Sequence, residues 1–193
     1  MANIADDITE LVGNTPLLRL HKFEKEAGFE GKILAKLEVF NPTGSVKDRI
    51  AKNMIEQAER DGRLKPGGTI IEATSGNTGI GLAAIAAAKG YQAVIVMPDS
   101  MSKERIRILE AYGAKVVLTP GEKNMGGANE KAAEILEQTE NAIITGQGGN
   151  PSNPEAHYQT TGPEIWKDTG ENVDIFVATV GTGGTISGTG KFL

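Results

Sequence analysis

The sequence contains no cysteine and only two histidines, His21 and His157. Without cysteine, the chain can form neither a disulfide bond nor a cysteine-ligated zinc site, and it offers no thiolate nucleophile. Two histidines leave few candidates for a histidine metal site or for a Ser-His-Asp triad. The sequence therefore predicts no metal site and points to chemistry that depends on other side chains.

Long apolar runs and an excess of positive charge are also missing. No apolar stretch reaches the roughly 18–20 residues that a membrane-spanning helix needs. The formal net charge of −5 argues against binding to nucleic acid or to an anionic membrane. The first residues, MANIADDITELVG, lack the basic region and apolar stretch of a secretory signal. We therefore expect a cytoplasmic protein that binds neither nucleic acid nor membrane.

Glycine is abundant, with 25 among 193 residues, roughly twice its usual share of about 7%. Short runs rich in Val and Ile alternate with longer helical patterns. Strands are expected at 33–37, 69–72, 93–97, 115–118, 142–144 and 174–180, and helices at 46–60, 79–89, 102–112 and 127–139. This alternation predicts an α/β fold with a mainly parallel sheet flanked by helices, which binds ligands where strands end and helices begin.

The segment NPTGSVKDR, residues 41–49, places a lysine at the start of a helix. Asn-Pro-Thr-Gly forms a turn, and Ser45 is expected to cap the helix, with Asp48 three residues later in a variant of the capping box. Lys47 would then take the second helical position, where the helix dipole disfavours its charged form and lowers its pKa. A neutral amine is the nucleophile that Schiff-base chemistry requires. Taken alone, the pattern also fits a solvated surface lysine, which is the more common case.

Two loops rich in glycine and hydroxyl groups follow expected strands. TSGNTG, residues 74–79, combines three hydroxyls and an amide with a helix N-terminus, which suits a carboxylate or a phosphate. VGTGGTISG, residues 180–188, suits a phosphate because its glycines allow close backbone approach. The second loop matches neither the dinucleotide fingerprint nor the P-loop, since Ile186, Thr185 and Phe192 stand where those patterns need other residues. Each loop alone also fits an ordinary capped turn.

In this order, the motifs resemble the N-terminal portion of the pyridoxal-phosphate (PLP) dependent cysteine synthase (O-acetylserine sulfhydrylase) family and its relative cystathionine β-synthase. The likeness extends over ELVGNTPLLRL, AKLEVFNPTGSVKDRI, GGTIIEATSGNTGIGLA, VMPDSMSKERIRILEAYGAKVVLTPG, NPSNPEAHYQTTGPEIW and VGTGGTISG. The resemblance implies a fold-type II PLP enzyme. Residues 45–146 would form its smaller α/β domain, and residues 1–44 plus 147–193 an incomplete larger domain.

The resemblance also implies roles for individual residues. Lys47 matches the Schiff-base lysine, and Asn77 matches the residue that hydrogen-bonds the phenolic oxygen of the cofactor. The residues that match the grip on the substrate α-carboxylate are Thr74, Ser75, Gly76, Thr78 and Gln147. Those that match the cup around the cofactor phosphate are Gly181, Thr182, Gly183, Gly184 and Thr185.

Some features depart from the family pattern. Gly148 stands where the family usually has Phe after the glutamine, so we expect a more mobile loop around Gln147. The family's Ser or Thr at the pyridine nitrogen has no counterpart in these residues. The helix expected after 174–180 meets the end of the chain without a cap, so we expect a longer parent protein. His157 is expected to be a structural or surface histidine, without a role in the chemistry.

The implied activity is a β-replacement in which O-acetylserine and sulfide give cysteine and acetate, with Lys47 as general base at Cα. The motifs leave open a cystathionine β-synthase type of reaction, and they leave open an inactive truncated fragment that acts only as a binding module. The expected partners are a small amino-acid substrate and sulfide. By resemblance, the full-length protein is expected to be a homodimer that can bind serine acetyltransferase.

Overall fold

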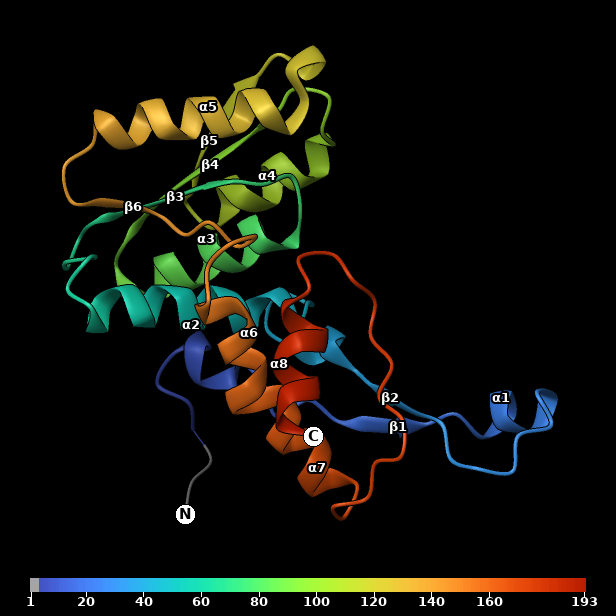
Figure 1. Cartoon of the computed structure of the whole chain (residues 1–193). Coiled ribbons are helices and arrows are strands. Elements are labelled where there is room, and N and C mark those ends of the chain that lie inside the picture. Colours follow the sequence, from blue (N-terminus) through green and yellow to red (C-terminus); the bar gives the residue numbers. More distant parts are fainter. Residues whose placement is uncertain (1–3) are drawn as a thin grey trace.

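The computed structural model describes residues 4–193, and its centre is a four-stranded parallel sheet (Figure 1). The strand order is β5-β4-β3-β6. These strands are β3 (Thr69–Ala73), β4 (Gln92–Pro98), β5 (Lys115–Thr119) and β6 (Ala142–Ile144). The helices around them are α2 (Lys47–Arg60), α3 (Asn77–Lys89), α4 (Lys103–Ala111) and α5 (Asn124–Glu137). The expected α/β fold with a parallel sheet flanked by helices is confirmed.

Alternating side chains of the central strands pack into two separate apolar clusters. Ile70 and Ile95 point to the side covered by α2 and α3, where they are fully buried. Ile71 and Val96 point to the opposite side, where they pack against α5. Both faces of the sheet are therefore covered, which explains why its strands read as continuous apolar runs.

Helix α3 is apolar nearly all round because it lies between the sheet and α2. Gly81 allows this close packing, since a Cβ there would lie 3.2 Å from the Cβ of Ala51 and 3.3 Å from the carbonyl oxygen of Lys47. The helix ends at Gly90, whose φ of 75° is the left-handed conformation that glycine adopts readily. The packing of α3 thus fixes the position of the first turn of α2.

Most of the remaining elements form a second region beside this sheet. Strands β1 (Leu17–Arg19) and β2 (Leu34–Lys36) pair antiparallel and carry α1 (His21–Glu26) on a protruding arm (Figure 1). Helices α6 (Ser152–Ala156), α7 (Gly162–Asp168) and α8 (Gly184–Phe192) pack together, with a π-helical turn, His157–Thr161, between α6 and α7. Short 3-10 turns lie at Ile8–Leu11, Glu38–Phe40 and Gly121–Lys123. Within residues 4–193, no helix combines the length and the apolar character needed to cross a membrane.

A buried ion-pair cluster around Arg49 joins α2 to this second region. The Arg49 side chain is only 1% exposed. It donates to both carboxylate oxygens of Glu38 at 2.7 and 2.8 Å, and to both of Glu164 at 2.7 Å. Lys36 adds an ion pair to Glu164 at 2.8 Å. Arg49, two residues after Lys47, thereby links α2 to α7 and to the turn after β2.

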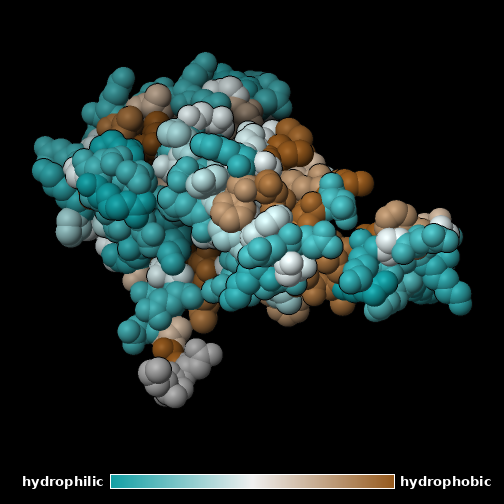
Figure 2. Space-filling model, turned by 60° about the horizontal axis from the view of Figure 1, so that its bottom comes forward, coloured by the Kyte–Doolittle hydropathy of each residue, from teal (hydrophilic) through white to brown (hydrophobic). Residues whose placement is uncertain are grey.

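The expected strand at 174–180 is wrong. No strand of the described residues pairs with this segment, so its backbone lacks the hydrogen bonds that define a strand. Its apolar side chains are exposed, with Ile175 at 79%, Val177 at 85% and Val180 at 70%. Figure 2 shows apolar surface where the main body meets the arm that carries α1. The segment is therefore apolar as expected, but the described chain leaves these three side chains largely uncovered.

Glycine in α8 sets how closely that helix approaches α6. A Cβ at Gly188 would lie 2.0 Å from the carbonyl oxygen of Pro154, whereas a Cβ at Gly190 meets no atom within 4 Å. We expect Gly188→Ala to lower the free energy of unfolding by about 1–3 kcal/mol, because backbone has to move. The control Gly190→Ala should be neutral or stabilising by up to about 1 kcal/mol. Urea unfolding of both variants tests this, and equal stabilities would contradict the packing described.

Candidate active site

Two loops meet where β3 and β6 end, as expected for parallel neighbours. Thr74 and Thr78 are buried in the TSGNTG loop, residues 74–79. The side-chain oxygen of Gln147 accepts a hydrogen bond from the Thr78 hydroxyl at 2.7 Å, and its NH2 group lies 3.5 Å from the Thr74 hydroxyl. The structure therefore brings together three of the residues expected to bind a carboxylate, from segments about seventy residues apart.

The rest of the TSGNTG loop faces outward. Ser75 and Gly76 are half-buried, and the guanidinium of Arg105 in α4 donates to the Ser75 carbonyl. Asn77 is exposed at the start of α3, and its side chain makes no hydrogen bond within residues 4–193. The loop thus has a fixed, buried side against Gln147 and an open side that carries Asn77.

The GTGGT loop, residues 181–185, lies next to Gln147. Asn153, which is 2% exposed, donates from its NH2 group to the Gln147 carbonyl and to the Thr182 hydroxyl, both at 2.9 Å. A cavity of about 160 Å³ opens between the two segments. It is lined by Gln147, Gly148, Gly149, Asn150, Pro151, Asn153, Pro154, Thr182, Gly183, Gly184 and Ser187. Asn153 is thus the link between the expected carboxylate and phosphate sites, and its role was not predicted.

Glycine is required at the start of α8 for two reasons. Gly183 has a φ of +83°, which other residues rarely adopt, and a Cβ at Gly184 would lie 1.9 Å from the side-chain oxygen of Asn153. The first amide groups of a helix have no partner within the helix, and they favour an anion. Because α8 begins at this cavity, its N-terminus and the hydroxyl of Thr182 form a set of donors suited to a phosphate.

His157 contacts the GTGGT loop through Thr185. The residue is 1% exposed, with Nδ1 2.9 Å from the Thr161 hydroxyl and Nε2 3.2 Å from the Thr185 hydroxyl. Burial, followed by the nearby positive charge of Arg49, lowers the pKa of His157 from its usual 6.5 to about 4. The expectation of a structural or surface histidine missed this contact with Thr185. The spacing of His157 and Thr161, one helical turn apart, was the available signal.

The low pKa of His157 predicts a pH dependence of stability. An unfolded chain binds a proton at this histidine near pH 6.5, whereas the folded chain does so only near pH 4. The contribution of His157 is therefore fully present above pH 6.5, and it is lost as the pH falls towards 4. Urea unfolding should show a smaller loss between these pH values in His157→Gln. The control His21→Gln keeps the buried histidine and should retain the loss; identical behaviour of both variants would contradict the assignment.

Lys47 is the first residue of α2, one position earlier in the helix than expected. The Ser45 hydroxyl accepts from the Lys47 N–H at 3.2 Å, although the N-cap position itself is Val46. The expected capping box is wrong, because the Asp48 carboxylate instead accepts from the N–H of Thr43 at 2.7 Å and from its hydroxyl. Burial lowers the pKa of Lys47 below its usual value, which favours a reactive neutral amine.

Among the described residues that line the cavity at the GTGGT loop, Lys47 is absent, but its charge acts on the same region. The positive charge of Lys47 contributes to the lowered pKa of His157, which contacts Thr185. The pieces present thus fit PLP: a half-buried amine with a lowered pKa for its aldehyde, and backbone amides with hydroxyls for its phosphate.

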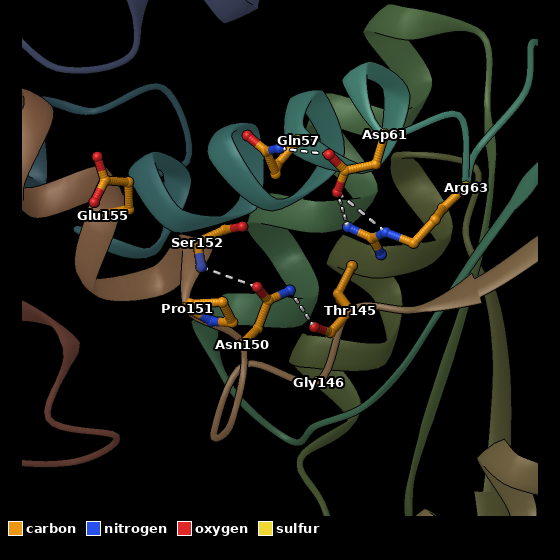
Figure 3. Close-up of a pocket in the computed structure, with 9 residues that line it drawn as sticks. All are labelled: Gln57, Asp61, Arg63, Thr145, Gly146, Asn150, Pro151, Ser152 and Glu155. Carbon is orange, nitrogen blue, oxygen red and sulfur yellow. Dashed lines mark hydrogen bonds and ion pairs between the residues drawn. The ribbon is translucent and has the colours of Figure 1, made fainter.

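A larger cavity of about 540 Å³ lies between α2 and the segment after β6 (Figure 3). Its polar groups largely satisfy one another: Asp61 accepts from Gln57 at 2.7 Å and from Arg63 at 3.0 Å. The Asn150 side chain donates to the Thr145 carbonyl at 2.7 Å. None of the site residues expected from the sequence lines this cavity, so its size does not make it the candidate active site.

Comparisons with known proteins point to one family. The sequence model of the family described as "Pyridoxal-phosphate dependent enzyme" matches residues 8–193. The chain is 54% identical to a probable cysteine synthase of Bacillus subtilis and 53% identical to a cysteine synthase of Staphylococcus aureus, over 100% and 97% of its own length. It superposes on a cysteine synthase (OASS) from Entamoeba histolytica with a TM-score of 0.94 at 46% identity, over 98% of the chain.

A hydrogen sulfide-producing enzyme from Fusobacterium nucleatum is also similar, with a TM-score of 0.91 and 47% identity over 98% of this chain. The chain spans 62% and 60% of the two curated relatives, and 57% and 62% of the two solved chains. The match by residues 8–193 covers almost the whole sequence. The chain therefore belongs to the pyridoxal-phosphate dependent enzyme family.

Proposed function

We propose that the whole protein is a PLP-dependent cysteine synthase of amino-acid biosynthesis, which converts O-acetylserine and sulfide to cysteine and acetate. The observation that carries the proposal is the meeting of Gln147 with Thr78 and Thr74 beside the GTGGT loop. This arrangement offers a carboxylate site next to a phosphate site. The identity of 53–54% to cysteine synthases supports the choice of reaction.

The residues divide into a cofactor set and a substrate set. Lys47 would attach the cofactor covalently, and Asn77 would donate to its ring oxygen. The amides and hydroxyls of Gly181, Thr182, Gly183, Gly184 and Thr185 would hold its phosphate. The groups that would hold the substrate α-carboxylate are those of Thr74, Ser75, Gly76, Thr78 and Gln147. When bound, PLP supplies an electron sink for the carbon that loses a proton.

Lys47 has the second role of moving that proton. With its amine free, Lys47 would take the proton from Cα of the substrate as general base. A lowered pKa suits this step, because more of the amine is neutral near pH 7 than for an ordinary lysine. The residues that bind the α-carboxylate would hold the substrate in one orientation, so that its Cα faces Lys47.

The test of this function is turnover by the whole protein. O-acetylserine plus sulfide should give cysteine and acetate, measured by chromatography of the products. Serine plus homocysteine should give little product, whereas efficient cystathionine formation would favour the cystathionine β-synthase type of reaction. Absence of turnover with both pairs, in a folded protein that contains PLP, would contradict the proposed function.

We further propose that residues 45–146 form the smaller domain and that residues 1–44 plus 147–193 belong to the larger one. The proposal rests on the resemblance, supported by the position of the four-stranded sheet within 45–146. On the same basis the whole protein would be a cytoplasmic homodimer that can bind serine acetyltransferase. Cell fractionation and size-exclusion chromatography, with and without that enzyme, test these expectations.

A further inference from the structure

A buried carboxylate lies beneath the segment that carries Gln147. Glu72 is the fourth residue of β3 and is 3% exposed. Parallel pairing of Ile71 with Ile144 places Glu72 beside the end of β6. Its carboxylate accepts from the Thr145 hydroxyl at 2.6 Å, from the Gly146 N–H at 2.7 Å and from the Gln147 N–H at 3.3 Å. The side chain of Glu72 thus directs all of these hydrogen bonds to one loop, the segment that follows β6.

We propose that Glu72 is a positioning residue that fixes Gln147 for binding the carboxylate of an amino-acid substrate, an inference that rests on the proposed function. The Glu72 carboxylate holds the backbone of Gln147 and Gly146. The Gln147 side chain then meets Thr78 at 2.7 Å. Glu72 therefore acts through Gln147, not by contact with the substrate.

The choice of glutamate is explained by the donors that it faces. All three partners donate hydrogen bonds, and a carboxylate is an acceptor with two oxygens. A glutamine in its place would turn an NH2 group, which cannot accept, towards these donors, and part of the three hydrogen bonds would be lost. Bonds to an ionised acceptor are also stronger than bonds between neutral groups.

The negative charge of Glu72 and its positioning of Gln147 predict opposite effects of a substitution on substrate binding. A negative Glu72 near a carboxylate site repels an anion, so removal of that charge should tighten binding if electrostatics dominated. If positioning dominates, the same substitution should weaken binding, because Gln147 loses its fixed backbone. Glu72→Gln separates the two roles by the direction of the change.

The first test is hydrogen exchange at the backbone amides of Gly146 and Gln147, which needs neither cofactor nor substrate. We expect Glu72→Gln to speed their exchange by about tenfold or more. The control is Asp99→Asn, because the Asp99 carboxylate also accepts from a loop amide, the Gly121 N–H at 3.0 Å, just after the neighbouring strand β4. This control should leave exchange at Gly146 and Gln147 unchanged. Unchanged exchange in Glu72→Gln overturns the inference. An unprotected Gly146 amide in the unmodified chain also overturns it, and that measurement does not depend on whether the variant folds.

The second test measures binding of L-alanine, which has the α-carboxylate but no leaving group, to the PLP-loaded protein. We expect the Kd for alanine to rise by roughly tenfold in Glu72→Gln. An equal or lower Kd overturns the positioning role. Faster exchange in the variant, combined with no alanine binding by the unmodified protein, would support the fixing of Gln147 and contradict the proposed function instead.

Discussion

Replacement of Lys47 by alanine should reduce the β-replacement activity of the whole protein by at least about a hundredfold, since a positioned general base contributes roughly 10² to 10⁴. The expected loss has two causes, the missing covalent bond to the cofactor and the missing base at Cα. PLP should still bind without a covalent bond, because the donors of the GTGGT loop remain. Steady-state rates and the PLP content of the purified variant measure both effects.

The control is Lys52→Ala on the same helix. Lys52 donates to the Thr9 carbonyl at 3.0 Å and has no proposed part in the chemistry. This variant should keep its activity and its covalently bound PLP. Turnover by Lys47→Ala close to that of the unmodified protein would refute the assignment, whatever the control does.

Replacement of Arg49 by methionine should have the largest effect on stability. The change leaves the carboxylates of Glu38 and Glu164 buried without their main partner, and breaking a buried ion pair in this way costs about 3–5 kcal/mol. Urea unfolding of the chain measures the loss. Arg60→Met is the control, because Arg60 is 53% exposed and its pair with Glu56 spans 3.9 Å. An exposed pair contributes about 0–1 kcal/mol, so a similar loss in both variants would contradict the role of Arg49.

The Arg49 cluster also has a signature at low pH. Burial raises the pKa of Glu164, but hydrogen bonds from Arg49 and Lys36 outweigh it and bring the pKa from its usual 4.5 down to about 2. This contribution to stability is present above pH 4.5, and it is lost as the pH falls from 4.5 towards 2. In Arg49→Met the pKa of Glu164 should rise, and the loss over this range should become smaller.

Much of the α/β core could be predicted because its signals are local. The run AVIVM gives a strand buried on both faces, and Gly90 ends α3 as a glycine cap should. Segment 174–180 shows the limit of such reasoning. It is rich in Ile and Val, as strands often are, but pairing depends on a neighbour, and the described chain supplies none.

The site could be predicted in part. Resemblance named Thr78 and Gln147, and the structure brings them into contact. Glu72 and Asn153 escaped prediction because their bonds cross about seventy and thirty residues of sequence. The capping box at Ser45 failed for a related reason: Asp48 had a competing partner in Thr43, which the local pattern does not reveal.

Lys47 should be the residue that binds PLP covalently. The chain should be mixed with PLP and treated with borohydride, which makes the bond between cofactor and amine permanent. It is then digested and mapped by mass spectrometry. We expect the added pyridoxyl group on the peptide that contains Lys47, at a PLP concentration that leaves the other lysines unmodified. Label spread over surface lysines, with Lys47 unmodified in the folded chain, would contradict the account.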